Sequence, residues 1–127
     1  MAKHYKGLTD SESRAFDERL LSYDQRAAVA QGKAAQAFGR LLNLAETRDS
    51  GQARSIAHFV AATYNGAAFK FDLFDMRMLD VQISDDMLAA LDALRWGKTD
   101  LFRLVPEGEK RVLAVIAFWG LQPASQP

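Results

Sequence analysis

Apolar residues recur with a regular spacing in the N-terminal third of the chain. From Phe16 to Leu44 the intervals alternate between four and three residues. The positions are Phe16, Leu20, Tyr23, Ala27, Ala30, Ala34, Ala37, Leu41 and Leu44. This alternation is typical of a heptad helix whose apolar seam faces another helix. The pattern predicts a long helix over residues 10–47, with Thr9 or Asp10 as its N-cap and Glu12 completing a capping box with Thr9.

The length of this helix raises the question of what covers it. A single straight helix over residues 10–47 would be about 57 Å long at about 1.5 Å per residue. A compact chain of 127 residues is only about 36 Å across. Either the helix bends or breaks, with Gly32 and Gly39 as candidate points, or part of its seam packs on a second chain.

Charges flank the seam in a pattern that suits a parallel pair of helices. With Phe16 at heptad position d, the g positions are basic and the e positions begin acidic. They are Arg19, Arg26, Lys33 and Arg40 at g, and Asp17, Asp24, Gln31 and Phe38 at e. Parallel pairing would place Arg19 beside Asp24 of a partner. The seam from Phe16 to Leu41 is therefore a candidate homodimer interface, and an intramolecular bundle is the alternative.

Shorter helices are expected after residue 48. Asp49 or Ser50 can cap a helix over residues 51–64, and Asn65-Gly66 is a typical stop signal. Residues 67–71 form an extended connector or a brief strand. Asp72 is expected to cap a short helix to about residue 79, and Ser84 to cap another over residues 85–96.

The last apolar segment allows two structures. Pro106 favours the first turn of a helix that runs to Trp119. The alternative is a hairpin of residues 101–105 and 111–116, but the apolar positions do not alternate, which favours the helix. The sequence thus predicts an all-α bundle of about five helices in a single domain, residues 10–120. Residues 1–9 and 121–127 are expected to be flexible ends.

Composition narrows the class of protein. Lys plus Arg and Asp plus Glu each number 16, so the formal net charge is zero and gives no general reason to expect nucleic acid or an anionic membrane as partner. The longest apolar run, residues 112–119, is far shorter than the ~18 residues of a membrane span. Cysteine is absent, and the polar N-terminus does not resemble a signal peptide. We expect a cytoplasmic protein.

Several separated segments resemble a known family. They are FGRLLNLAETRDSGQARSIAHFV from Phe38, YNGAAFKFDLFD from Tyr64, ISDDML from Ile83 and VPEGEKRVLAVIAFWG from Val105. From about residue 38 onward the chain resembles a bacterial domain family of unknown function, whose members are encoded on integrative and conjugative elements and plasmids of proteobacteria. The resemblance implies a small accessory protein of a mobile element and no activity. It does not extend to the first half of the heptad seam.

Candidate chemistry is sparse. His4 and His58 are the only histidines, and neither has the spacing of a metal-binding motif. No GxSxG, GxGxxG or P-loop pattern occurs, so we expect neither catalysis nor a cofactor. Five aspartates could form an acidic docking face or hold Mg²⁺. They are Asp72, Asp75, Asp80, Asp85 and Asp86.

Three functions follow as hypotheses. The first is a non-enzymatic accessory protein that binds another protein, such as a host defence component that it inhibits. The second is a nucleic-acid-binding regulator that uses the basic stripe Arg19, Arg26, Lys33 and Arg40. The third is a small metal-dependent enzyme built on the acidic cluster.

Overall fold

The protein is all-α, as the sequence predicts. The computed structural model describes residue 7 and residues 9–124, except the side chain of Leu21. It contains four α-helices and two 3₁₀ helices in that part of the chain, and no strand there. In chain order they are α1 (Asp10–Thr47), α2 (Gly51–Tyr64), η1 (Leu73–Met78), α3 (Val81–Arg95), η2 (Leu101–Leu104) and α4 (Gly108–Phe118). The histidine at position 4 and the outer parts of the predicted flexible ends lie outside the described residues.

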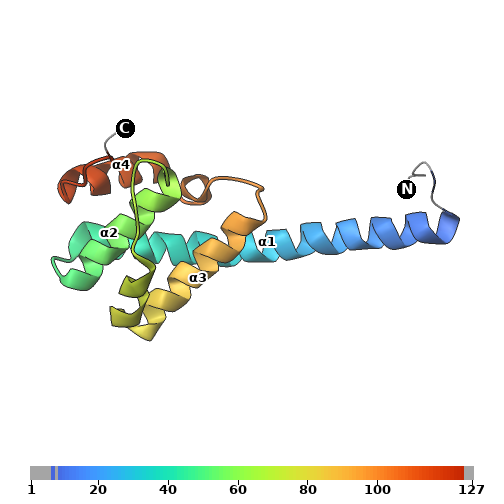
Figure 1. Ribbon diagram of the computed structural model, residues 1–127, viewed down its shortest axis with the longest axis horizontal. Coiled ribbons are helices and arrows are strands. Elements are labelled where there is room, and N and C mark those ends of the chain that lie inside the picture. The colour runs from blue at the N-terminus through green and yellow to red at the C-terminus, as the bar shows by residue number, and fades with distance from the viewer. Residues whose placement is uncertain (1–6, 8, 125–127) are drawn as a thin grey trace.

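Helix α1 is continuous over its 38 residues. Thr9 accepts a hydrogen bond from the backbone N–H of Glu12, and Glu12 accepts one from the backbone N–H of Thr9, so the predicted capping box is present. Neither Gly32 nor Gly39 interrupts the helix. Its C-terminal half lies among α2, α3 and α4, whereas its first turns extend beyond this body (Figure 1).

The hydrophobic core lies between the C-terminal half of α1 and the other helices. Its largest fully buried side chains come from every α-helix and from η2. They are Phe38, Leu41, Leu42, Ile56, Val60, Met87, Leu101, Val112 and Val115. The buried alanines of the seam in α1 have small side chains, which let α3 approach closely with its own Ala90 and Ala93.

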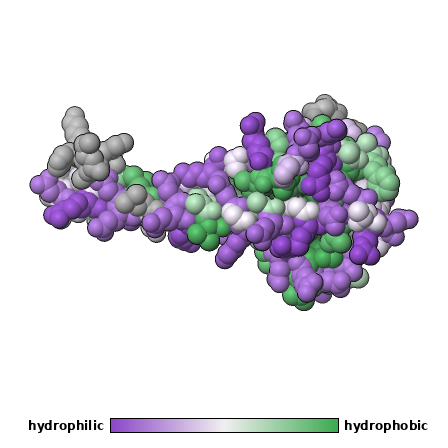
Figure 2. Space-filling view, turned by 180° about the vertical axis from the view of Figure 1, so that it is seen from behind, coloured by the Kyte–Doolittle hydropathy of each residue, from purple (hydrophilic) through white to green (hydrophobic). Residues whose placement is uncertain are grey.

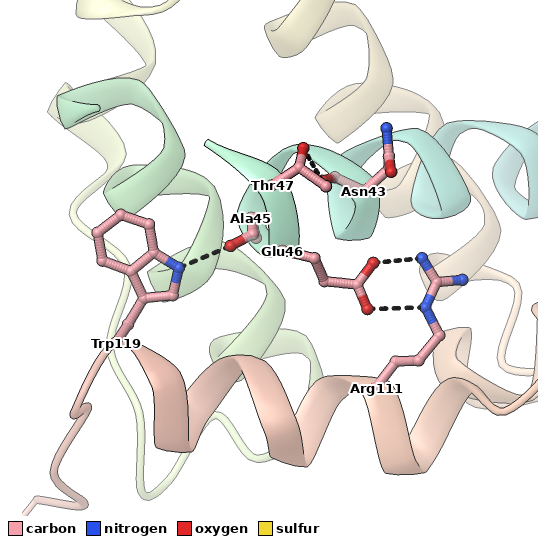
Figure 3. A network of polar contacts seen from close by, with 6 residues as sticks. All are labelled: Asn43, Ala45, Glu46, Thr47, Arg111 and Trp119. Carbon is pink, nitrogen blue, oxygen red and sulfur yellow. Dashed lines mark hydrogen bonds and ion pairs between the residues drawn. The ribbon is translucent and has the colours of Figure 1, made fainter. Parts of the chain in front are cut away.

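Polar contacts fix α4 to the end of α1 (Figure 3). Arg111 donates two hydrogen bonds to the Glu46 carboxylate, at 2.6 and 2.9 Å. This pairing raises the pKa of Arg111, and the guanidinium stays charged. The indole Nε1 of Trp119 donates to the carbonyl of Ala45 at 2.9 Å, which satisfies one of the last carbonyls of α1.

Two helix starts differ from the prediction. Helix α3 begins at Val81 with Asp80 at the N-cap, so Ser84 is inside the helix, where its hydroxyl donates to the carbonyl of Val81. Asp85 and Asp86 therefore do not lie in its first turn. Helix α4 begins at Gly108, because a turn over residues 105–108 intervenes, in which the N–H of Gly108 donates to the carbonyl of Val105.

The hairpin alternative and the brief strand are both wrong. Residues 101–104 are the 3₁₀ helix η2, and residues 111–116 lie within α4. Phe69 and Phe71 pack against the core instead of pairing as a strand, and the ring of Phe71 meets that of Phe59 edge-on.

The chain after α4 is packed at first. Leu121 is buried in the core, and the N–H of Ala124 donates to the carbonyl of Ala68 at 2.7 Å. Residues 121–124 are thus part of the body, although the sequence suggested a loose tail from residue 121.

Candidate interaction surfaces

The predicted seam divides into two parts in the structure. From Ala27 onward its residues are buried within the chain: Ala27, Ala30, Ala34, Ala37 and Leu41 are each at most 3% exposed. They cannot also face a second copy, because α3 and its neighbours already cover them. The N-terminal part is different, since Leu20 is 45% exposed and Tyr23 is 40% exposed. The seam is therefore a continuous stripe with two different environments.

The first turns of α1 form a projecting segment, defined here as residues 10–22 (Figure 1). Green hydrophobic surface interrupts the otherwise hydrophilic rod in Figure 2. Phe16 is half-buried, and Arg19 lies over its ring at 5.7 Å. Leu20 follows one turn later on the same face. An apolar face thus continues beyond the point where the body ends.

A cluster of aromatic and charged residues holds α1 where it leaves the body. The hydroxyl of Tyr23 donates to the carbonyl of Trp96 at 2.7 Å, and the two rings meet edge-on at 4.7 Å. Arg26 and Arg95 lie on the Trp96 ring at 4.9 and 4.6 Å. Asp24, the residue after Tyr23, forms an ion pair with Lys98, whose Nζ lies 2.8 Å from the carboxylate Oδ1. These contacts fix the direction of the projecting segment relative to α3.

The basic stripe is partly occupied by intramolecular contacts. Arg40 donates two hydrogen bonds to Asp86, at 2.8 and 3.0 Å, and this raises the pKa of Arg40. Arg26 is stacked on Trp96. Lys33 lies on the same side of the helix in a shallow pocket with Arg26. The four residues thus do not form an open row of cations.

The five aspartates have different roles. Asp72 caps η1 by accepting from the N–H of Phe74 at 2.9 Å, and Asp86 is paired with Arg40. Asp80 makes no side-chain hydrogen bond at the start of α3. No group of three or more potential ligands lies close enough to hold a metal ion among residues 9–124 and residue 7. The structure does not gather the cluster into one metal-binding geometry in that part of the chain.

A hydrophobic patch that sequence reasoning missed lies beside these aspartates. Leu73, Phe74, Met78 and Val81 are between 71% and 79% exposed, and Leu88 is 56% exposed. They come from η1 and the outer face of α3. We call these five residues the η1–α3 patch. The signal in the sequence is the segment 70–83, which holds more large apolar residues than the short helix η1 and the start of α3 bury.

An apolar groove adjoins the patch between α2 and α3. It encloses about 310 Å³ and shares Leu73 with the patch. Its other apolar walls are Phe59, Phe69, Phe71, Met76, Leu91 and Leu94. Exposed apolar surface on this scale is typical of sites that contact another molecule.

His58 lies on α2 near Arg54 and Asp75. Burial and the positive charge of Arg54 lower the pKa of His58, and Asp75 opposes that shift. The imidazole is therefore mainly neutral at neutral pH. None of these neighbours is placed as a metal ligand or a nucleophile among the described residues.

No helix within the described residues is both long and apolar enough to cross a membrane.

Comparison with known proteins identifies a family but no activity. No curated protein and no solved structure matches the chain. A family model matches residues 35–120, which include the C-terminal part of α1 and all the later helices and exclude the projecting segment. The chain therefore belongs to the family of unknown function DUF7673.

Proposed function

We propose that the protein is a cytoplasmic, non-enzymatic accessory protein that acts by binding other proteins, and that it works as a homodimer joined through the projecting segment of α1. The observation that carries the proposal is Leu20, which is 45% exposed in the projecting segment and continues a seam that is buried elsewhere. The chain resembles a family of proteins that are encoded on mobile genetic elements, and this supports an accessory role. Inhibition of a host defence component is one example of such a role.

The projecting segment offers one favourable contribution to dimerisation. A helix of about 12–15 residues without tertiary contacts is marginal in water. The projecting segment continues a longer helix, so no separate helix nucleation is needed. The body covers little of its apolar face. Burial of Leu20 against a second copy would contribute roughly 1–2 kcal/mol per subunit.

Charge favours a parallel arrangement of the two copies. In a parallel pair, Arg19 of one copy would lie beside Asp24 of the other, which would then be shared between Arg19 and the Lys98 of its own chain. In an antiparallel pair, g positions meet g positions, so Arg19 would approach Arg26 of the other copy. Because that contact is repulsive, the parallel pair is the one we propose. Its bodies would then lie at the same end of the pair.

Light scattering tests the dimer directly. The full-length protein at micromolar concentration should show about twice the chain mass of 14.1 kDa. Leu20→Glu should reduce this to the monomer mass, since a carboxylate would be buried in the seam. Val29→Glu is the matched control, because Val29 is 59% exposed on α1 but lies off the seam. A monomeric wild-type protein, or a dimer that tolerates Leu20→Glu, would contradict the proposal.

The structure supports protein binding over nucleic-acid binding. Arg40 and Arg26 are already engaged with Asp86 and Trp96, so few cations of the stripe remain to contact phosphates. A mobility-shift assay at two salt concentrations distinguishes the two functions. Strong, salt-sensitive retardation of DNA or RNA would favour the nucleic-acid alternative instead.

A further inference from the structure

We infer that the η1–α3 patch binds an amphipathic helix of a partner protein whose apolar stripe is flanked by Lys or Arg. This inference deepens the proposed function, on which it rests, by naming the chemistry of the partner. The site does not involve the projecting segment, because the patch lies on the body, at the lower end in Figure 1. Figure 2 likewise shows hydrophobic surface at the lower end of the body.

The apolar part of the site has a shape suited to a helix. Val81 and Leu88 are seven residues apart on α3 and therefore lie on the same face, two turns from each other. Leu73, Phe74 and Met78 extend this surface from the neighbouring η1. The groove lined by Phe59, Phe71 and Leu94 continues from Leu73. A helix laid along such a surface can insert apolar side chains from successive turns.

The charged part of the site selects a basic partner. Five aspartates and two basic residues, Lys70 and Arg77, lie between residues 70 and 86. The segment is therefore net acidic even with both cations counted, and the ammonium of Lys70 donates to the carbonyl of Gly66 at 2.9 Å. Asp80 and Asp85 are exposed, and within the described part of the chain neither is in an ion pair. Asp85 lies between Val81 and Leu88 on the outer face of α3.

Charge also excludes other occupants of the patch. An anionic membrane or an acidic segment would be repelled by Asp80 and Asp85. The projecting segment of another copy is itself net acidic, with four acidic residues and two basic ones, Arg14 and Arg19, between residues 10 and 22. A Lys-flanked or Arg-flanked apolar helix satisfies both parts of the surface, because its cations pair with the carboxylates while its apolar stripe covers the patch.

Binding of two synthetic peptides to the full-length protein tests the inference. One peptide is an amphipathic helix of Leu and Lys, and the other has the same Leu positions with Glu in place of Lys. Anisotropy of the labelled Leu/Lys peptide should show binding, whereas the Leu/Glu peptide should not bind. The Phe74→Ser/Met78→Ser variant should weaken Leu/Lys binding by about tenfold or more. The Asp80→Asn/Asp85→Asn variant should weaken it and reduce its salt dependence.

Controls separate this site from non-specific attraction and from the dimer. Phe118→Ser removes an equally exposed apolar residue, 67% exposed at the end of α4, and should leave peptide binding unchanged. Equal binding of both peptides, binding that survives the patch variants, or sedimentation with anionic vesicles instead would overturn the inference. Light scattering on the same patch variants reports the dimer separately, since they should keep the wild-type mass.

Discussion

Gly108 is the residue at which the fold tolerates a side chain least. A Cβ atom at this position would lie 1.7 Å from the carbonyl oxygen of Phe102 and 2.7 Å from its carbon. Both atoms belong to the backbone of η2, so they cannot move aside cheaply. Close packing of α4 on η2 therefore requires glycine here.

We predict that Gly108→Ala destabilises the protein by about 3 kcal/mol, because the backbone of η2 or α4 must shift. Gly32→Ala is the matched control. Gly32 lies within α1, and an added Cβ would meet no atom within 4 Å. That variant should stabilise α1 by roughly 0.5–1 kcal/mol. Urea unfolding of both variants measures the difference, and equal stabilities would contradict the close packing of α4 on η2.

His58 makes stability depend on pH. Its pKa in the folded protein is lowered below the ordinary 6.5 by burial and by Arg54. The unfolded chain therefore binds the proton more readily, and stability falls as the pH drops below about 6.5. In His58→Gln this contribution should be absent. The melting temperatures of the two proteins, measured from pH 7.5 to 5.5, should follow different slopes, and parallel curves would refute the assignment.

At the scale of elements, N-cap residues predict the starts of helices most accurately. Thr9 with Glu12, Ser50 and Asp72 each accept the expected backbone hydrogen bond. The start of α3 was placed wrongly, because Ser84 looks like a cap although Gln52, distant in sequence, accepts a hydrogen bond from the N–H of Asp80. A tertiary contact of this kind leaves no local signal.

The seam shows a second limit of pattern analysis. Its period indicated correctly which face of α1 is apolar, but a period does not identify what covers that face. Ala27 and Leu41 are covered by the chain's own helices, whereas Leu20 is not. The η1–α3 patch shows the converse: Leu73, Phe74 and Met78 are apolar in the sequence, but no local pattern indicates that η1 leaves them exposed.

The two halves of α1 should differ in local stability. In the monomeric Leu20→Glu variant, backbone amides of residues 14–22 should exchange with solvent much faster than those of residues 34–44, because only the latter lie against the core. If the wild-type protein is the proposed dimer, exchange in residues 14–22 should be slower than in this variant. Hydrogen exchange followed by mass spectrometry measures both. Equal protection in the two proteins would show that no second copy covers the segment.

At the scale of the whole molecule, the family match and the fold divide the chain in a similar way. The matched residues 35–120 make up most of the body, with its patch and groove, whereas the projecting segment lies outside the match. The proposed partner binding and the proposed self-association therefore belong to separate parts of one chain. Variants in one part should leave the other unaffected.

The uninterrupted backbone of α1 has a consequence for binding strength. Because one stiff helix joins the contact between copies to the body, a parallel pair would carry two identical docking surfaces at a fixed spacing. A target that presents two matching helices would engage the second one at a high effective concentration, so its overall avidity would far exceed the affinity of either single contact. Such a protein would discriminate assembled targets from their isolated subunits.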